Sequence, residues 1–270
     1  MAGSIMFTVW IAGAAALALA YPPSFLWLPP TAIKWLLGIL VFFMGTAAGP
    51  SDFYACLRKP RPFLINFVGC FAVAPALALG LARLACLPEP FLVGMVLVGG
   101  VNGGSSSNLF TLFVGGDVAL SVLMTVTTTL SAVVCTPLVA KVCLGAIVPV
   151  DSWGILHSVM LPISLGVFAS AARPDLCKRL QPVIPTLGLL IAVPIIGAVV
   201  AGSAQQILRA GVSLHASVLA FHVLAAGVGY TLAFASGLDE RDRRTLTIEV
   251  AMKNSVLACV LAAAHFEDPE

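Results

Sequence analysis

The sequence predicts an all-α integral membrane protein, and three observations lead to this prediction. Of 270 residues, 60% are hydrophobic and 10% are charged, a composition far from that of soluble domains. Apolar runs of about 20 residues, the length that crosses the hydrocarbon core, follow one another along the chain. The basic residues gather in the short joints between these runs. With so few charges, the chain has no basic surface suited to nucleic acid.

Nine transmembrane helices are predicted when the chain is divided wherever charges, prolines or turn residues interrupt an apolar run. The sequence shows no soluble domain and no extended linker. Each boundary carries a margin of about two to four residues. The predicted spans are residues 4–20, 32–50, 63–84, 91–114, 118–145, 153–172, 182–203, 212–236 and 245–264.

The joints between the spans alternate in charge, which predicts the topology. On one side, only Lys34, Arg83, Lys141 and Arg209 lie near span ends. Basic joints stay on the side from which the chain is inserted, so we expect the N-terminus and the even-numbered joints on the cytoplasmic or stromal side. The membrane itself stays open between a plasma membrane and a plastid envelope. The even-numbered joints hold Arg58, Lys59, Arg61, Arg173, Lys178, Arg179, Arg241, Arg243 and Arg244.

The fourth span contains the stretch GGVNGGSSSN, residues 99–108, near its middle. Small residues let membrane helices pack closely, which is one explanation. Two glycine pairs followed by three serines and an asparagine exceed what close packing requires. Non-helical backbone at membrane depth must line a cavity or be buried in protein. We therefore expect a discontinuous helix whose half-helix ends expose carbonyl and amide groups.

The ninth span carries two ionisable residues, Glu249 and Lys253. Such residues at membrane depth are costly and indicate function, although a pair four residues apart on a helix is also typical of a structural ion pair. The fourth and ninth spans would occupy corresponding places if the fold consists of two inverted repeats of five. Paired polar interruptions of this kind indicate a secondary transporter whose site lies at the repeat interface.

The fifth span adds oxygen atoms suited to a cation. Asp117 is expected to cap its start, and Ser121 and Thr125 then stand one turn apart on one face. The alternative is that each hydroxyl only bonds the carbonyl four residues back.

Four motifs together resemble the bile acid:sodium symporter family, including its bacterial and plastid members. They are GGSSSN (103–108), GDVALS (116–121), RTLTIEVAMKNS (244–255) and HFEDP (265–269). The resemblance implies ten helices in two inverted repeats, with the broken fourth and ninth helices crossing at mid-membrane. It implies one transporter domain, residues 1–270, with a panel (1–57 and 150–205) and a core (62–148 and 210–270).

The family fold continues into a tenth helix after the HFEDP segment, whereas this chain ends at Glu270. We therefore expect nine of the ten helices. A truncated sequence is the explanation that we favour over a core that lacks one wall.

The resemblance also implies site residues. Asn108 and Asn254 flank the crossover and would face an organic anion, with Ser106 and Ser255 beside them. A sodium ion, the only cofactor expected and the only metal, would be held by Ser107, Asn108, Ser121, Thr125 and Glu249.

The chain departs from the family at a second sodium site. Two glutamines of the family correspond here to Cys70 and Lys253. Cysteine supplies no hard oxygen, and an ammonium a few ångströms from a sodium ion repels it by several kcal/mol at intermediate dielectric. We hypothesise that the Lys253 ammonium takes the place of the second ion, with Glu249 as its near partner.

These observations predict a sodium-coupled symporter of an organic anion, a steroid-like or small carboxylate, that works by alternating access and not as an enzyme. A proton-coupled or uncoupled carrier of the same fold is the alternative. More remote alternatives are a channel and an intramembrane hydrolase using Ser105 to Ser107 with His222 as base. The expected partners are the substrate and the lipid bilayer, without an obligatory protein partner.

Overall fold

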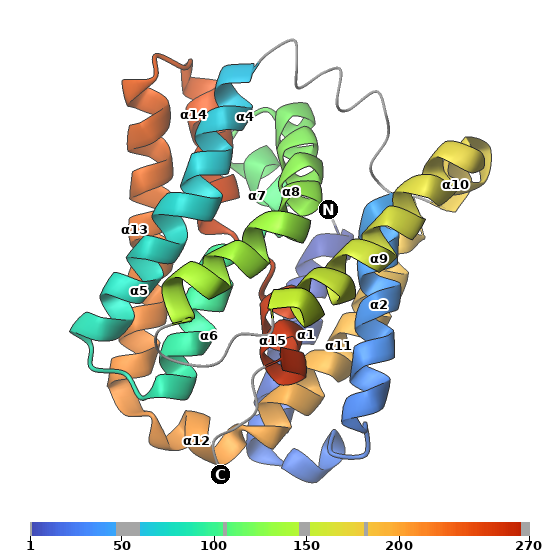
Figure 1. Cartoon of the computed structure of the whole chain (residues 1–270), viewed down its shortest axis with the longest axis vertical. Coiled ribbons are helices and arrows are strands. Elements are labelled where there is room, and N and C mark those ends of the chain that lie inside the picture. Colours follow the sequence, from blue (N-terminus) through green and yellow to red (C-terminus); the bar gives the residue numbers. More distant parts are fainter. Residues whose placement is uncertain (1, 47–59, 105–106, 146–151, 181–182, 266–270) are drawn as a thin grey trace.

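The computed structural model describes residues 2–46, 60–104, 107–145, 152–180 and 183–265. Within these ranges every regular element is a helix and none is a strand, as the sequence predicts (Figure 1). The elements are α1 (Ala2–Ala20), η1 (Pro22–Ser24), α2 (Pro30–Thr46), α4 (Pro60–Val68), η2 (Gly69–Val73), α5 (Ala74–Leu84), α6 (Glu89–Gly100), α7 (Ser107–Phe113), α8 (Val118–Leu144), α9 (Ser152–Ala172), α10 (Pro174–Leu180), α11 (Ile184–Gly202), α12 (Ala204–Arg209), α13 (Gly211–Ala235), α14 (Glu240–Ala251) and α15 (Ser255–His265).

Three helical stretches are long and apolar enough to cross a membrane, judged by length and composition over the described residues. They are Pro60–Leu84, which joins α4, η2 and α5, then Val118–Leu144 and Gly211–Ala235. Shorter apolar helices accompany them. The described residues thus agree with the predicted all-helical membrane protein, whereas the count of nine spans and the inverted repeats stay predictions.

The helices pack in two neighbouring groups. Helices α4, α5, α13 and α14 lie side by side, and α2 packs on α9 while α1 packs on α11 (Figure 1). A continuous apolar cluster joins the groups, with Leu37 of α2, Ala78 of α5, Val96 of α6 and Leu261 of α15 all buried in it. The division of these groups into moving panel and core domains stays a prediction.

Two helices are interrupted where the sequence predicts breaks. Helix α6 ends at Gly100 and α7 begins at Ser107, and α14 ends at Ala251 while α15 begins at Ser255. Each gap leaves backbone groups that the helices themselves do not satisfy. The two gaps lie against each other, and this contact builds the candidate site.

Close contact between α2 and α9 depends on two glycines. A Cβ atom at Gly166 would meet the Phe42 carbonyl oxygen and would stand 2.8 Å from the Thr46 nitrogen. A Cβ atom at Gly45 would meet the Ile163 carbonyl oxygen. Because these neighbours are backbone atoms, they cannot turn away, and the small residues set the distance between the two helices.

We expect Gly166→Ala to lower the free energy of unfolding by about 1–3 kcal/mol, the usual cost of overpacking. The measurement is the midpoint of thermal unfolding of the purified protein. Gly80→Ala in α5 is the matched control, because a Cβ atom there meets nothing within 4 Å. An equal midpoint for the two variants would contradict the close packing of α2 on α9.

Candidate functional site

The two interrupted helices cross through a short antiparallel backbone contact. The Gly104 nitrogen donates to the Met252 carbonyl at 2.9 Å, and the Asn254 nitrogen donates to the Asn102 carbonyl at 3.0 Å. Gly103 and Lys253 form an isolated antiparallel bridge between these bonds. The crossing therefore satisfies backbone groups that the breaks release and that neither water nor lipid would satisfy in a buried position.

Glycine at the crossing lets the two chains approach. A Cβ atom at Gly103 would lie 2.8 Å from Glu249 Oε2, and one at Gly104 would lie 3.1 Å from the Lys253 carbonyl oxygen. The first contact shows that the break between α6 and α7 covers the carboxylate of Glu249. A larger residue at position 103 would displace that carboxylate.

Three hydroxyl groups surround the Glu249 carboxylate, which is fully buried. Ser107 of α7 and Ser121 of α8 each donate to Glu249 Oε1 at 2.5 Å. Thr125, one turn after Ser121, lies 3.2 Å from Oε1 and 3.1 Å from Oε2. Ser121 Oγ also lies 2.8 Å from Asn108 Oδ1. The structure thus brings together all five residues that the resemblance assigns to one cation site.

Helical spacing explains why these groups meet. Ser121 and Thr125 are four residues apart on α8, so their side chains lie on one face. Asp117 caps the start of α8, as predicted, and accepts a bond from the Leu120 nitrogen at 3.1 Å. The short helix α7 brings Ser107 from the other side.

Thr111 is a buried hydroxyl of the site that the sequence reasoning missed. Its Oγ1 donates to Ser121 Oγ at 3.2 Å, and its side chain is fully buried. Thr111 follows Ser107 by four residues and therefore lies on the same face of α7. That spacing is the signal that would have identified it.

The donor set fits a small hard cation. A carboxylate without access to water is costly unless a charge or several hydrogen bonds compensate it. The oxygens of Glu249, Ser107, Ser121, Thr125 and Asn108 are carboxylate, hydroxyl and amide oxygens, the ligands that hard cations prefer. The described residues contain no group of three His, Cys, Asp or Glu side chains that would hold a transition metal.

The Lys253 ammonium bonds two backbone carbonyls and does not pair directly with the Glu249 carboxylate. Its Nζ donates to the Cys70 carbonyl at 3.2 Å and to the Val101 carbonyl at 3.4 Å. Glu249 and Lys253, both in the described part of the chain, form no ion pair within 4 Å. The alternative of a structural ion pair four residues apart on one helix is wrong, because α14 ends at Ala251, before Lys253.

Local backbone structure explains why these two carbonyls are available. Residues Gly69–Val73 form a π-helical turn in which the Ala74 nitrogen bonds the Gly69 carbonyl. The next donor in this register is residue 75, which is a proline and has no N–H, so the Cys70 carbonyl lacks a donor within its helix. Val101 follows the last residue of α6, where the helix dipole favours a positive charge.

The predicted substrate residues differ in how deeply they are buried. The Asn254 side chain is buried and caps α15, accepting from the Leu257 nitrogen at 3.2 Å. Asn108 is half-buried beside Ser121, whereas Ser255 is exposed. Ser106 lies outside the described residues.

Two further polar groups lie near the crossing. Among the described residues, Asn102 Oδ1 and Asn66 Nδ2 are buried without a hydrogen-bond partner.

The residues of the hydrolase alternative have other partners. His222 Nδ1 lies 2.8 Å from the Ala251 carbonyl, and Ser107 bonds Glu249. Neither residue is arranged as the serine and base of a hydrolase, and Ser105 lies outside the described residues.

The comparisons with known proteins agree with the motifs. Residues 34–210 match the sequence model of the family described as the Sodium Bile acid symporter family. A probable chloroplastic sodium/metabolite cotransporter of Oryza sativa subsp. japonica is 34% identical, over 98% of this chain and 66% of its own length. A protein of the same description from Arabidopsis thaliana is 33% identical, over 98% and 67%.

An uncharacterized sodium-dependent transporter of Bacillus subtilis (strain 168) is 32% identical, over 96% of this chain and 82% of its own. The chain spans about two thirds of the length of the plant relatives. The family and these relatives are named as transporters, in agreement with the prediction that the chain is not an enzyme.

We expect Thr125→Val to lower the free energy of unfolding by about 1.5–3 kcal/mol, the usual value of a hydrogen bond to a charged group. Thermal unfolding in sodium-free choline chloride measures it without any contribution from sodium binding. Thr128→Val is the matched control, because the Thr128 hydroxyl bonds only the carbonyls of Met124 and Thr125 on its own helix. Equal losses in the two variants would show that Thr125 does not support the Glu249 carboxylate.

Proposed function

Because the chain belongs to the sodium bile acid symporter family, we propose that it is a secondary active transporter that couples sodium influx to the uptake of an organic anion by alternating access. The observation that carries the proposal is the buried Glu249 carboxylate surrounded by three hydroxyls where two broken helices cross. The relatives named as sodium/metabolite cotransporters support the same conclusion. Which membrane holds the protein stays a prediction.

Sodium would bind at the Glu249 carboxylate, with hydroxyl ligands from Ser107, Ser121 and Thr125 and the amide oxygen of Asn108. The cation neutralises the charge that the buried carboxylate otherwise carries alone. Each hydroxyl would then turn its lone pairs toward the ion, while Thr111 Oγ1 donates to Ser121 Oγ. Because these ligands come from α7, α8 and α14, sodium binding favours the conformation in which the three helices are together.

A single sodium ion per cycle is the expected coupling. The Lys253 ammonium already supplies a positive charge to the Cys70 and Val101 carbonyls. A second cation in this region would be repelled by Lys253 by several kcal/mol at intermediate dielectric. The specific observation that favours the alternative, a proton-coupled carrier of the same fold, is the burial of the ionisable Lys253 side chain.

The substrate would be a carboxylate of the steroid-like or small monocarboxylate class. Asn108, Asn254, Ser106 and Ser255 are the proposed contacts, and Lys253 adds the positive charge that an anion near the crossing requires. The exposed Ser255 at the start of α15 is the contact most open to a ligand.

We expect the full chain, reconstituted in proteoliposomes, to take up a radiolabelled carboxylate from a panel of pyruvate-like acids and steroid conjugates only under an inward sodium gradient. Glu249→Gln removes the charge that holds the ion and should abolish the sodium stimulation. Glu89→Gln at the exposed start of α6 is the matched control. Equal uptake with and without sodium, or currents far above carrier turnover, would contradict sodium-coupled carriage.

We expect the rate of uptake to depend on sodium with a Hill coefficient close to one. The double variant Lys253→Gln with Cys70→Gln replaces the ammonium by amide oxygens and should give a steeper sodium dependence. Lys141→Gln at the exposed end of α8 controls for the loss of one charge. A coefficient near two in the unmodified protein would show that Lys253 does not replace an ion.

A further inference from the structure

Helix α14 carries a column of three polar residues that leads from the charged end of the helix to the candidate site. Arg241, Thr245 and Glu249 follow one another at intervals of four residues and therefore lie on one face. Thr245 and Glu249 are both fully buried. Glu249 belongs to the proposed sodium site, whereas nothing in the site described above uses Arg241 or Thr245.

The turn between α7 and α8 lies against this column. Gly115 has a positive φ of 70°, and the Gly116 nitrogen donates to the Thr111 carbonyl at 2.8 Å, the arrangement of a glycine helix terminus. Asp117 then caps α8. This turn fixes how Ser107 on α7 and Ser121 on α8 stand relative to each other.

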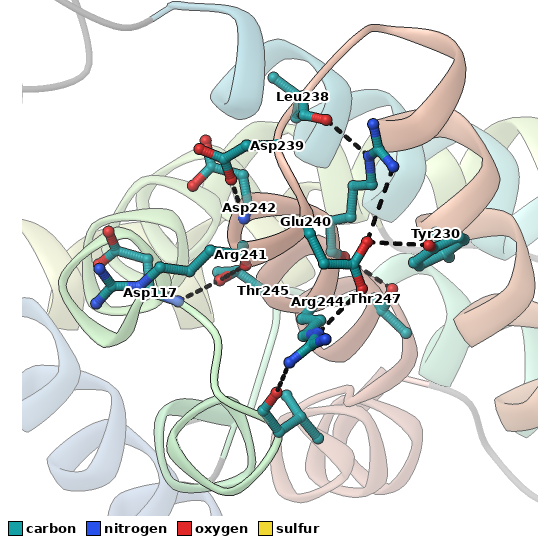
Figure 2. A network of polar contacts seen from close by, with 12 residues as sticks. Asp117, Tyr230, Leu238, Asp239, Glu240, Arg241, Asp242, Arg244, Thr245 and Thr247 are labelled. Atoms are coloured by element: carbon teal, nitrogen blue, oxygen red, sulfur yellow. Dashed lines mark hydrogen bonds and ion pairs between the residues drawn. The ribbon is translucent and has the colours of Figure 1, made fainter.

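Three hydrogen bonds fasten the turn to α14, and Figure 2 draws the one between Asp117 and Thr245. The Asp117 nitrogen donates to Thr245 Oγ1 at 2.8 Å. Arg241 Nε donates to the Gly116 carbonyl at 3.4 Å, and Arg244 Nη1 donates to the Val114 carbonyl at 3.1 Å. Thr245 Oγ1 donates its proton to the Arg241 carbonyl oxygen at 3.0 Å. A lone pair of the same oxygen is therefore free to accept from the Asp117 N–H.

Glycine at position 116 is required for this contact. A Cβ atom there would lie 2.8 Å from Thr245 Oγ1 and 2.7 Å from Thr111 Cγ2. The turn therefore approaches both the column on α14 and the Thr111 side chain, whose hydroxyl donates to Ser121. Moving the turn away from Thr245 also moves the neighbours of the Glu249 carboxylate.

The outer end of the contact is held by an ionised carboxylate. Arg244 Nε donates to Glu240 Oε1 at 3.0 Å, and the Tyr230 hydroxyl donates to Glu240 Oε2 at 3.1 Å (Figure 2). These bonds hold the pKa of the Glu240 carboxyl below its ordinary value, and the bond from Arg244 has the largest effect. Glu240 therefore stays charged at neutral pH and directs the Arg244 guanidinium toward the Val114 carbonyl.

We propose that Thr245 is a positioning residue for the cation site: its hydroxyl, together with Arg241, holds the α7–α8 turn so that the hydroxyls of Ser107 and Ser121 meet Glu249, and it thereby sets the affinity for sodium. This inference rests on the proposed function, because it assigns to Thr245 a role in the binding of the coupled ion. Thr245 acts through the turn and does not touch the cation.

The test measures sodium affinity without a substrate. The full chain in lipid nanodiscs is titrated with sodium chloride against choline chloride at constant ionic strength, and the apparent Kd is taken from the rise of the unfolding midpoint. Thr245→Val keeps the shape of the side chain and removes the acceptor of the Asp117 N–H. We expect the Kd to rise roughly tenfold, as it does when groups that support metal ligands are lost.

Two substitutions serve as controls. Thr245→Ser keeps the hydroxyl and should restore the Kd to within about twofold of the unmodified value. Thr247→Val on the same helix removes a hydroxyl that bonds only the Arg243 carbonyl and should have an equally small effect. A general loss of stability would appear in choline chloride alone and would not change the dependence on sodium.

A second route to the same contact is Gly116→Ala, which pushes the turn away from Thr245 and should also raise the sodium Kd. Because both changes disturb one contact, the double variant should raise it by less than the product of the single effects. If Thr245→Val does not fold, Gly116→Ala compared with Gly94→Ala, whose Cβ meets nothing within 4 Å, gives the same test.

The outcomes separate the inference from the proposed function. If sodium raises the midpoint of the unmodified protein but Thr245→Val and Thr247→Val have equal Kd values, Thr245 is not a positioning residue and the sodium site stands. If sodium does not raise the midpoint of the unmodified protein, the sodium site itself is wrong. A raised Kd in Thr245→Val that Thr245→Ser restores supports both.

Discussion

The Glu249 carboxylate is buried inside a membrane protein, and the arrangement around it follows from the need to satisfy its charge. An ionised group at this depth is stable only with hydrogen bonds or a counter-charge. Hydroxyls from α7 and α8 supply the hydrogen bonds, and Gly103 lets the broken segment between α6 and α7 cover the carboxylate. In the proposed function a monovalent cation supplies the counter-charge, because Lys253 donates to backbone carbonyls and forms no ion pair with Glu249 among the described residues.

The crossing of the two broken helices stabilises this arrangement by pairing buried backbone groups. Two backbone bonds between residues 102–104 and 252–254 satisfy groups that the breaks release. The Cys70 carbonyl, left without a helical donor by the π-helical turn and Pro75, accepts from Lys253 in turn. The proposed cation site, the crossing and the Lys253 contact lie among buried apolar residues, including Val101 in one cluster, Cys70 and Val250 in a second and Met124 in a third.

Much of this could be predicted from sequence, because breaks and helical spacing are local. The glycine and serine run before Asn108 predicted a break, and the interval of four between Ser121 and Thr125 placed both on one face. The direction of the Lys253 ammonium could not be predicted, because it depends on where α14 ends and on a π-helical turn far away in sequence. Thr111 follows Ser107 by the same interval of four on α7 and could have been predicted in the same way. The contact of Thr245 could not be predicted, because it depends on how the α7–α8 turn packs against α14.

The most direct test of the proposed sodium site is anomalous diffraction from crystals of the full chain in which thallium(I) replaces sodium. We predict one anomalous peak among the Glu249 carboxylate and the hydroxyls of Ser107, Ser121 and Thr125, and none beside the Lys253 ammonium. A map without density at Glu249, or with a second peak between Lys253 and the Cys70 carbonyl, would contradict the account.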